Sequence, residues 1–232
     1  MINYALENNY INREYILNNT NAAYLIDSSY QFDDGIFSGY DPAKRSYNKS
    51  TWVYELDGNG LPRRDDSLQH PRSVFQLLKK HYSRYTTDAV CRITGTPRDD
   101  FRKICEVYTS TWSSNRAGTW LYAMGTTQHT HGTQNIRAYS ILQLLLGNIG
   151  VAGGGVNAMR GESNVQGSTD AALLFHLLPG YLKSPAAADV DLATYIKNYT
   201  PTTKDPLSAN WWGNTPKYIV SLLKAWYGDH AT

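Results

Sequence analysis

The feature that most constrains the fold is a short apolar run followed at once by a glycine-containing turn and a helical pattern. Residues Gly118–Ala123 are largely apolar and aromatic, which is typical of a buried strand in a parallel sheet. Met124-Gly125 ends this strand, and Thr133–Leu146 then carries helical spacing. Strand, glycine turn and helix form the βα unit of a doubly wound α/β sheet, in which ligands bind at the carboxyl ends of strands. We therefore expect an α/β fold with a polar site at the turn Met124–His129.

The second constraint is the glycine-rich stretch Gly147–Gly167, for which we expect little regular structure. Seven of its 21 residues are glycine, and three of these are consecutive at positions 153–155. Glycine loses much conformational freedom on folding, so such a run is retained where the backbone must approach something closely. A flexible linker is the alternative. The polar residues Asn157, Arg160, Asn164 and Gln166 punctuate the run and favour a ligand-binding loop.

Composition narrows the class of protein. A formal charge of +2 over 232 residues does not indicate a nucleic-acid-binding surface. No run approaches the roughly 20 apolar residues of a membrane span. The first residues, MINYALENNY, lack the basic and apolar parts of a signal peptide and resemble the middle of a helix, which leaves open whether Met1 is the natural start. Cys91 and Cys105 form no CxxC motif and are expected to be buried core thiols.

Helical spacing dominates the chain outside residues 27–70. Residues 1–26 are predicted to be helical, and within them Asn12 is expected to cap the helix Arg13–Asn19. Residues 27–70 are interpreted as an irregular surface insertion with a small hairpin. The aromatic residues expected to pack this insertion are Phe32, Phe37, Tyr40 and Trp52, and its expected strand is Thr51–Leu56.

The remaining predicted helices follow turn and capping signals. One of them, opened by Thr96-Pro97, is expected to bury Phe101, Ile104, Cys105 and Tyr108. The expected helical ranges are 71–85, 87–91, 97–108, 170–178, 189–199 and 215–227, with Gly228 closing the last one.

Polar side chains in the two turns carry the predicted chemistry. Arg160 stands between a glycine-rich loop and Gly161, and its guanidinium fork suits a carboxylate or phosphate. The alternative for Arg160 is a surface residue that caps the helix Thr133–Leu146 or pairs with Glu162. Gln128, Asn164 and Gln166 offer donors and acceptors that suit the edge of a heterocycle such as a pterin or guanine. Thr126 and Thr127 could meet phosphate oxygens at a helix N-terminus.

The sequence gives little support for a metal site or for the familiar metalloprotease and phosphate-binding motifs. His129 and His131 are two residues apart and do not share one helix face, so hydrogen-bonding or structural roles are favoured for them. The sequence contains no HExxH, no GxxxxGK[ST] and no set of four metal ligands.

The two turns together carry a resemblance to a known family. The residues are MGTTQHTHGTQNIRAYSILQLLLGNIGVAGGGVNAMRGESNVQG, with flanking LQHPR, FSGYD, LPGY, WGN and PK. This pattern resembles the molybdopterin oxidoreductase superfamily, and within it the catalytic (alpha) subunit of membrane-anchored respiratory formate dehydrogenases. The pairing of RGxxNxQG with an earlier MGxTQ is more specific than either motif alone.

The resemblance implies roles for individual positions. Arg160 matches the active-site arginine that orients the carboxylate of formate beside the metal. The expected contacts to a bis-molybdopterin guanine dinucleotide, carrying molybdenum or tungsten, are Met124, Gly125, Thr127, Gln128, His129, Gly161, Asn164, Gln166 and Gly167. No residue of this chain matches a metal ligand.

The resemblance also implies that this chain is an internal piece of a longer subunit. The family's (seleno)cysteine ligand and the cysteines of its iron–sulfur cluster lie upstream, and a further cofactor domain lies downstream. Residues 1–162 are expected to be the later part of a Rossmann-like α/β domain, and residues 163–232 the opening part of a second. The chain alone is expected to be inactive.

The expected partners are formate, the rest of the alpha subunit, an iron–sulfur beta subunit and a membrane cytochrome gamma subunit, in the periplasm. The alternatives are a nitrate or sulfoxide reductase of the same superfamily, or a non-catalytic pterin- or nucleotide-binding module.

Overall fold

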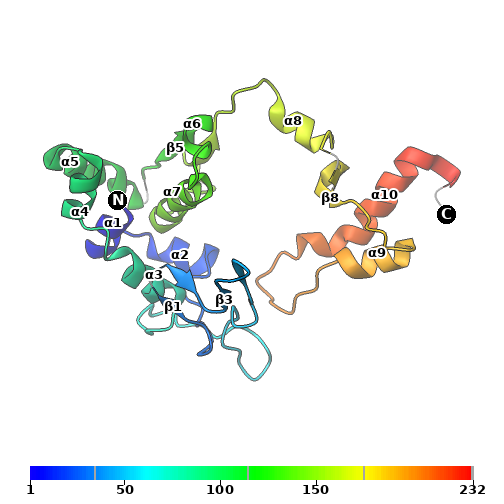
Figure 1. Cartoon of the computed structure of the whole chain (residues 1–232), viewed down its shortest axis with the longest axis horizontal. Helices are drawn as coiled ribbons and strands as arrows, with labels where there is room; N and C mark the ends of the chain where they lie inside the picture. The colour runs from blue at the N-terminus through cyan, green and yellow to red at the C-terminus, as the bar shows by residue number, and fades with distance from the viewer. Residues whose placement is uncertain (34, 114, 175, 231–232) are drawn as a thin grey trace. The chain divides into compact units, whose positions relative to one another are not determined.

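The computed structural model describes residues 1–33, 35–113, 115–174 and 176–230. The chain divides into two compact units, Met1–Met159 and Arg160–Thr232, coloured blue to yellow-green and yellow to red in Figure 1. Helices and short strands both occur, which agrees with the predicted α/β class at this coarse level. The predicted domain boundary after residue 162 stays a prediction.

The first unit is built mainly from helices around one parallel strand pair. Its helices are α1 (Ile2–Glu7), α2 (Arg13–Asn19), α3 (Val74–Tyr82), α4 (Thr87–Thr94), α5 (Arg98–Thr109), α6 (Met124–Thr127) and α7 (Gly132–Leu146), with a 3-10 turn η1 at Ser110–Trp112. Its strands are β1 (Phe32–Asp33), β2 (Ile36–Phe37), β3 (Tyr40–Asp41), β4 (Ser46–Tyr47), β5 (Thr119–Tyr122) and β6 (Gly155–Ala158).

Capping side chains set several of these helix boundaries. The Asn12 side chain accepts a hydrogen bond from the Tyr15 amide at 3.0 Å, so the predicted helix Arg13–Asn19 is confirmed with its cap. Thr86 caps α4 in the same way, and Gly95 ends that helix in a left-handed conformation. The α3 helix begins at Val74 rather than Pro71, because Ser73 supplies the cap that accepts from the Gln76 amide.

The core of the first unit lies between α1, α2, α3 and α7. Its buried members include Leu6, Ile16, Leu68, Phe75 and Leu146. Cys105 is fully buried, as predicted, whereas Cys91 is only half-buried. The predicted inner face of α5 is wrong at Ile104, which is 53% exposed, because the buried face of α5 runs instead through Cys105 and Thr109.

The segment 27–70 contains two small hairpins, β1–β2 and β3–β4, with the predicted aromatic packing. The ring of Phe37 contacts Phe32 and Trp52 with centroids 5.1 and 5.0 Å apart. The predicted strand Thr51–Leu56 is wrong, because only Tyr54 and Leu56 form isolated bridges, to Ile26 and Pro62. The Asp57–Gly60 turn follows directly and reverses the chain before a ladder can extend.

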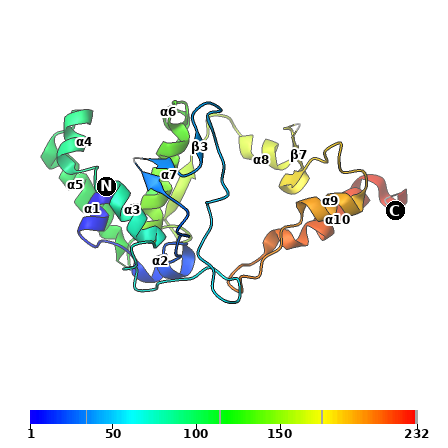
Figure 2. The same ribbon diagram turned by 60° about the horizontal axis from the view of Figure 1, so that its bottom comes forward.

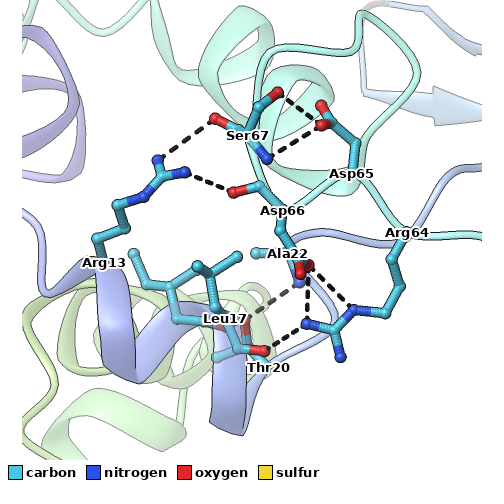
Figure 3. A network of polar contacts seen from close by, with 9 residues as sticks. Arg13, Leu17, Thr20, Ala22, Arg64, Asp65, Asp66 and Ser67 are labelled. Atoms are coloured by element: carbon cyan, nitrogen blue, oxygen red, sulfur yellow. Dashed lines mark hydrogen bonds and ion pairs between the residues drawn. The ribbon is translucent and has the colours of Figure 1, made fainter.

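Two arginines join this segment to α2 (Figure 3). Arg13 of α2 donates to the carbonyls of Asp66 and Ser67. Arg64 donates to the Leu17 carbonyl and to the Asp66 carboxylate, each at 3.0 Å. The Asp65 side chain accepts from the amides of Ser67, Gln69 and His70 and from the Ser67 hydroxyl, so it organises the turn itself. An irregular backbone is therefore fixed here by side chains.

The second unit is smaller. Its elements are α8 (Val165–Asp170), β7 (Leu177–Leu178), η2 (Pro179–Tyr181), β8 (Leu182–Lys183), α9 (Leu192–Tyr199), η3 (Trp211–Asn214), α10 (Thr215–Tyr227) and η4 (Gly228–His230). Its buried core consists of Leu182, Tyr195 and Ile219. Helices α9 and α10 lie side by side in Figures 1 and 2, and the predicted closure of α10 by Gly228 is confirmed.

The predicted helix 170–178 is wrong. The helix lies earlier, at Val165–Asp170, and the chain turns at Ala172, whose backbone is left-handed with φ 59°. Leu173 is 74% exposed and Leu174 is 44% exposed, so the two leucines after this turn are not packed into a core. Phe175 lies outside the described residues. The predicted 189–199 helix begins at Leu192, capped by Asp191.

Candidate functional site

A βαβ unit positions the first predicted turn. Strands β5 and β6 pair in parallel, from Thr119 opposite Gly155 to Tyr122 opposite Ala158, and α7 connects them. The predicted strand Gly118–Ala123 and helix Thr133–Leu146 are therefore confirmed to within a residue. The predicted burial of the strand is wrong, because Thr119 and Leu121 are exposed and the other two residues of β5 are only half-buried. The expectation of little regular structure in Gly147–Gly167 is wrong, because β6 forms there by pairing with β5.

The amino ends of β5 and β6 are held by a buried polar network. The Gln143 side chain is fully buried, and its Nε2 donates to the carbonyls of Gly118 and Gly155, each at 2.7 Å. Its Oε1 accepts from the Tyr108 hydroxyl and from Asn148 Nδ2, each at 2.9 Å. Burial raises the pKa of Tyr108 to about 12, which keeps its hydroxyl a donor.

Asn148 completes this network. Its Nδ2 also donates to Thr111 at 2.9 Å, and its Oδ1 accepts from the Gly118 amide at 3.2 Å. Each of these polar side chains therefore has a partner, which makes the network an ordered clamp across the two strands. We did not predict this role from the sequence, although Gln143 is the one polar residue in the otherwise apolar run Ile141–Leu146.

The carboxyl ends of the two strands lie together at the opposite edge. The Met159 amide, just after β6, donates to the Tyr122 carbonyl at 2.7 Å. The single helical turn α6 follows β5 through Ala123, so part of the first predicted turn is helical. This is the edge at which parallel α/β sheets bind ligands.

The predicted residues of the first turn are exposed at this edge. Met124 is 47% exposed, and the amide of Gln128 approaches its sulfur at 3.6 Å. The side chain of Thr127 contacts the Met124 carbonyl at 3.4 Å. A ring nitrogen of His129 bonds the Gly125 carbonyl at 2.7 Å, so His129 braces the turn. A Cβ placed on Gly125 would meet nothing within 4 Å, which leaves open space beside the backbone.

The join between α6 and α7 requires a glycine. A Cβ on Gly132 would lie 2.1 Å from the Thr127 carbonyl oxygen, too close for any side chain. Asn135 adds a bond from its side chain to the Thr126 carbonyl at 3.3 Å. The turn is thus packed tightly against the start of α7 on one side and open on the other.

The second set of predicted residues belongs to the second unit. Arg160 is exposed and has a left-handed backbone, with φ 57°, which is uncommon outside glycine and is concentrated at functional sites. Gly161 and Gln166 are exposed as well. Asn164 also has a left-handed backbone, with φ 54°, and precedes α8.

The side chain of Asn164 lies against Gly167. A Cβ on Gly167 would lie 2.2 Å from the Asn164 Oδ1, so the asparagine side chain occupies the space that a larger residue would need. The Ser168 amide donates to the Asn164 carbonyl at 3.1 Å and begins the helix. The RGESNVQG motif is therefore a left-handed turn leading into a short helix.

The residues present fit the organic part of a large polar cofactor better than a metal ion. Amide, hydroxyl and guanidinium groups stand exposed in the two motifs, and the backbone at Gly125 leaves room for a close approach. Within the described residues, no group of three or more His, Cys, Asp or Glu side chains could hold a metal. Of the described helices, none is both long and apolar enough to cross a bilayer.

Comparison with known proteins identifies relatives over the whole chain, although no family model matches. The chain is 54% identical over 231 residues to the nitrate-inducible formate dehydrogenase major subunit of Escherichia coli K12. It is 52% identical over 229 residues to formate dehydrogenase subunit alpha of Megalodesulfovibrio gigas. It is 51% identical over 232 residues to formate dehydrogenase 2 subunit alpha (cytochrome c-553) of Nitratidesulfovibrio vulgaris.

These matches cover 99 to 100% of this chain but 23% of the length of each relative. The resemblance noted from the two motifs is thus confirmed, and it extends to the residues between and around them. From one end to the other, the chain is thus similar to one segment of formate dehydrogenase alpha (major) subunits.

Proposed function

We propose that this chain is a segment of a formate dehydrogenase catalytic subunit that oxidises formate to carbon dioxide. In the complete enzyme the α6 turn and the loop Arg160–Gly167 would bind a bis-molybdopterin guanine dinucleotide, and Arg160 would orient formate. The observation that carries the proposal is the identity of 50 to 54%, over the whole of this chain, to formate dehydrogenase subunits. The exposed polar turn at the carboxyl edge of β5 and β6 supports it independently.

Arg160 suits the recognition of formate, because this substrate is little more than a carboxylate. A guanidinium binds both oxygens of a carboxylate through two parallel hydrogen bonds, which fixes the direction of the C–H bond as well as the charge. A lysine offers a point charge without that fork. The left-handed backbone of Arg160 costs about 1 kcal/mol or more and is the kind of local strain that a binding role accounts for.

The remaining predicted residues would hold the cofactor by its organic part. Gln128, Asn164 and Gln166 carry amides that can pair with both donors and acceptors on pterin and guanine edges. Thr127 offers a hydroxyl to a phosphate, and Gly125 leaves its backbone accessible. When bound, the cofactor would supply the two-electron acceptor that the conversion of formate to carbon dioxide and a proton requires.

Several parts of this proposal lie outside the 232 residues. The metal ligand and an iron–sulfur cluster would come from the rest of the alpha subunit. The first unit would be the later part of a Rossmann-like doubly wound domain, and residues 163–232 the opening of the next α/β domain. By resemblance, the complete enzyme would work in the periplasm with an iron–sulfur beta subunit and a membrane cytochrome gamma subunit.

Arg160→Lys in the complete enzyme tests the substrate role. We expect kcat/KM for formate to fall about 100-fold to 1,000-fold, comparable to losing one well-placed donor to a reacting anion. Metal and pterin content should stay at the wild-type level. Arg92→Lys, an exposed arginine of α4, is the matched control and should leave the kinetics unchanged. Wild-type kinetics in a fully loaded Arg160→Lys enzyme would overturn the role of Arg160.

A dye-linked assay separates the substrate classes. Turnover with formate, and none with nitrate or a sulfoxide, is the expected result. Turnover with nitrate or a sulfoxide instead would assign the chain to another molybdopterin enzyme.

A further inference from the structure

The loop Arg160–Gly167 has little apolar packing of its own. No described residue of α8, which begins within the loop at Val165, is buried. Two residues of the loop, Arg160 and Asn164, have left-handed backbones that favour alternatives unless something outside the loop restrains them. A short helix of this kind is marginal by itself, so the loop depends on contacts elsewhere in the second unit.

One such contact comes from Tyr181. Its hydroxyl donates a hydrogen bond to the carboxylate of Asp170, the last residue of α8. The next residue, Leu182, is buried in the core with Tyr195 and Ile219. Tyr181 therefore joins the end of α8 to the best-packed part of the unit through one charge-assisted hydrogen bond.

The positive charge of Arg160 also affects the Tyr181 hydroxyl. The pKa of Tyr181 is raised, first because its hydroxyl bonds Asp170, while the positive charge of Arg160 acts in the opposite direction. The charges of Arg160 and Asp170 thus act in opposite directions on the Tyr181 hydroxyl. The two ends of the RGESNVQG segment, the arginine and the helix that follows, are both associated with this tyrosine.

We propose that Tyr181 is a positioning residue for Arg160: through its hydrogen bond to Asp170 it holds α8, and with it the loop, in the conformation that presents the guanidinium to an anionic substrate. This inference rests on the proposed function of Arg160. The tyrosine contacts no reacting atom in this role and acts through the helix.

Hydrogen exchange on the chain tests whether Tyr181 holds α8 in place. In Tyr181→Phe, the amides of Ser168, Ala171 and Leu173, which close α8 and the turn after it, should exchange about threefold to tenfold faster. Asp170→Ala should give the same increase. The double variant should give no further increase, because each single change already removes the same Tyr181–Asp170 hydrogen bond. Tyr199→Phe is the matched control, since Tyr199 bonds Asp189 away from the loop and should leave those amides unchanged.

Kinetics of the complete enzyme test whether this restraint presents Arg160 to formate. Tyr181→Phe and Asp170→Ala should each raise KM for formate about fivefold to twentyfold with kcat changed less than twofold, at unchanged metal content. Two results overturn the inference: unchanged exchange in both variants, or faster exchange with unchanged KM. If Arg160→Lys also leaves formate turnover unchanged, the proposed function itself fails. If Arg160→Lys lowers formate turnover but the Tyr181 and Asp170 variants leave exchange and KM unchanged, the positioning role alone fails.

Discussion

Replacing Gln143 by leucine should destabilise the first unit strongly. Gln143 is fully buried, and its two side-chain polar atoms make four hydrogen bonds, to Gly118, Gly155, Tyr108 and Asn148. Leucine has a similar volume, so the change creates little cavity and mainly leaves polar partners unpaired. The prediction therefore isolates the polar clamp at the amino ends of β5 and β6.

The magnitude follows from the groups left behind. Each buried donor or acceptor without a partner costs about 1–3 kcal/mol. The Asn148 amide is 1% exposed and loses one acceptor, and the carbonyls of Gly118 and Gly155 lose a shared donor. Burying the apolar leucine returns about 1–2 kcal/mol. We expect a net loss of about 3–5 kcal/mol, which corresponds to a fall in Tm of roughly 6 to 20 °C for a unit of this size.

The assay is urea unfolding followed by circular dichroism, with hydrogen exchange at β5 and β6 to assign the transition to the first unit. Gln134→Leu on the exposed face of the same helix is the control and should change stability by less than about 0.5 kcal/mol. A Gln143→Leu midpoint within error of that control would refute the reasoning. It would mean that water or relaxation satisfies the four groups.

Two further predictions concern backbone fit and pH. Gly132→Ala should cost about 1–3 kcal/mol, because its Cβ would meet the Thr127 carbonyl oxygen at 2.1 Å, whereas Gly125→Ala should leave chain stability unchanged and instead impair cofactor retention in the complete enzyme. Thermal melts and pterin content of the two variants check this pair. Asp65 has its pKa lowered to about 2, first by the Ser67 hydroxyl and then by backbone amides. Its stabilising contribution is therefore complete above about pH 5 and declines as the pH falls through 4 toward 2. Asp65→Asn should flatten that part of the stability curve measured by unfolding between pH 7 and 2.5.

Local signals predicted the elements that local contacts determine. Asn12 caps its own helix, and the boundaries of α7 and α10 follow from glycines at their ends. Strand β6 escaped prediction because GVNA has no strong strand pattern of its own. It becomes a strand by pairing with β5, whose partner residues Thr119 and Gly155 are 36 positions apart in the chain. Long-range pairing of this kind leaves little trace in periodicity.

The candidate site divides in the same way. The motifs alone indicate Arg160 and the α6 residues as candidates, and the roles of these residues stay predictions. Gln143, Asp170 and Tyr181 carry no such motif, and each matters through a partner that only the fold supplies. The predicted helix 170–178 also concealed the turn at Ala172 that separates Asp170 from the segment holding Tyr181.

The two motifs depend on separate supports, and this makes their roles experimentally separable. The α6 turn is fixed by the β5–α7–β6 unit, whose strands are clamped by Gln143 and Asn148. The Arg160 loop is fixed through Asp170 and Tyr181 to a different core around Leu182. Gln143→Leu should therefore loosen the first turn without changing exchange in α8, and Tyr181→Phe should do the reverse. If formate orientation and cofactor retention are divided between the motifs as proposed, the first variant should lose cofactor and the second should lose affinity for formate.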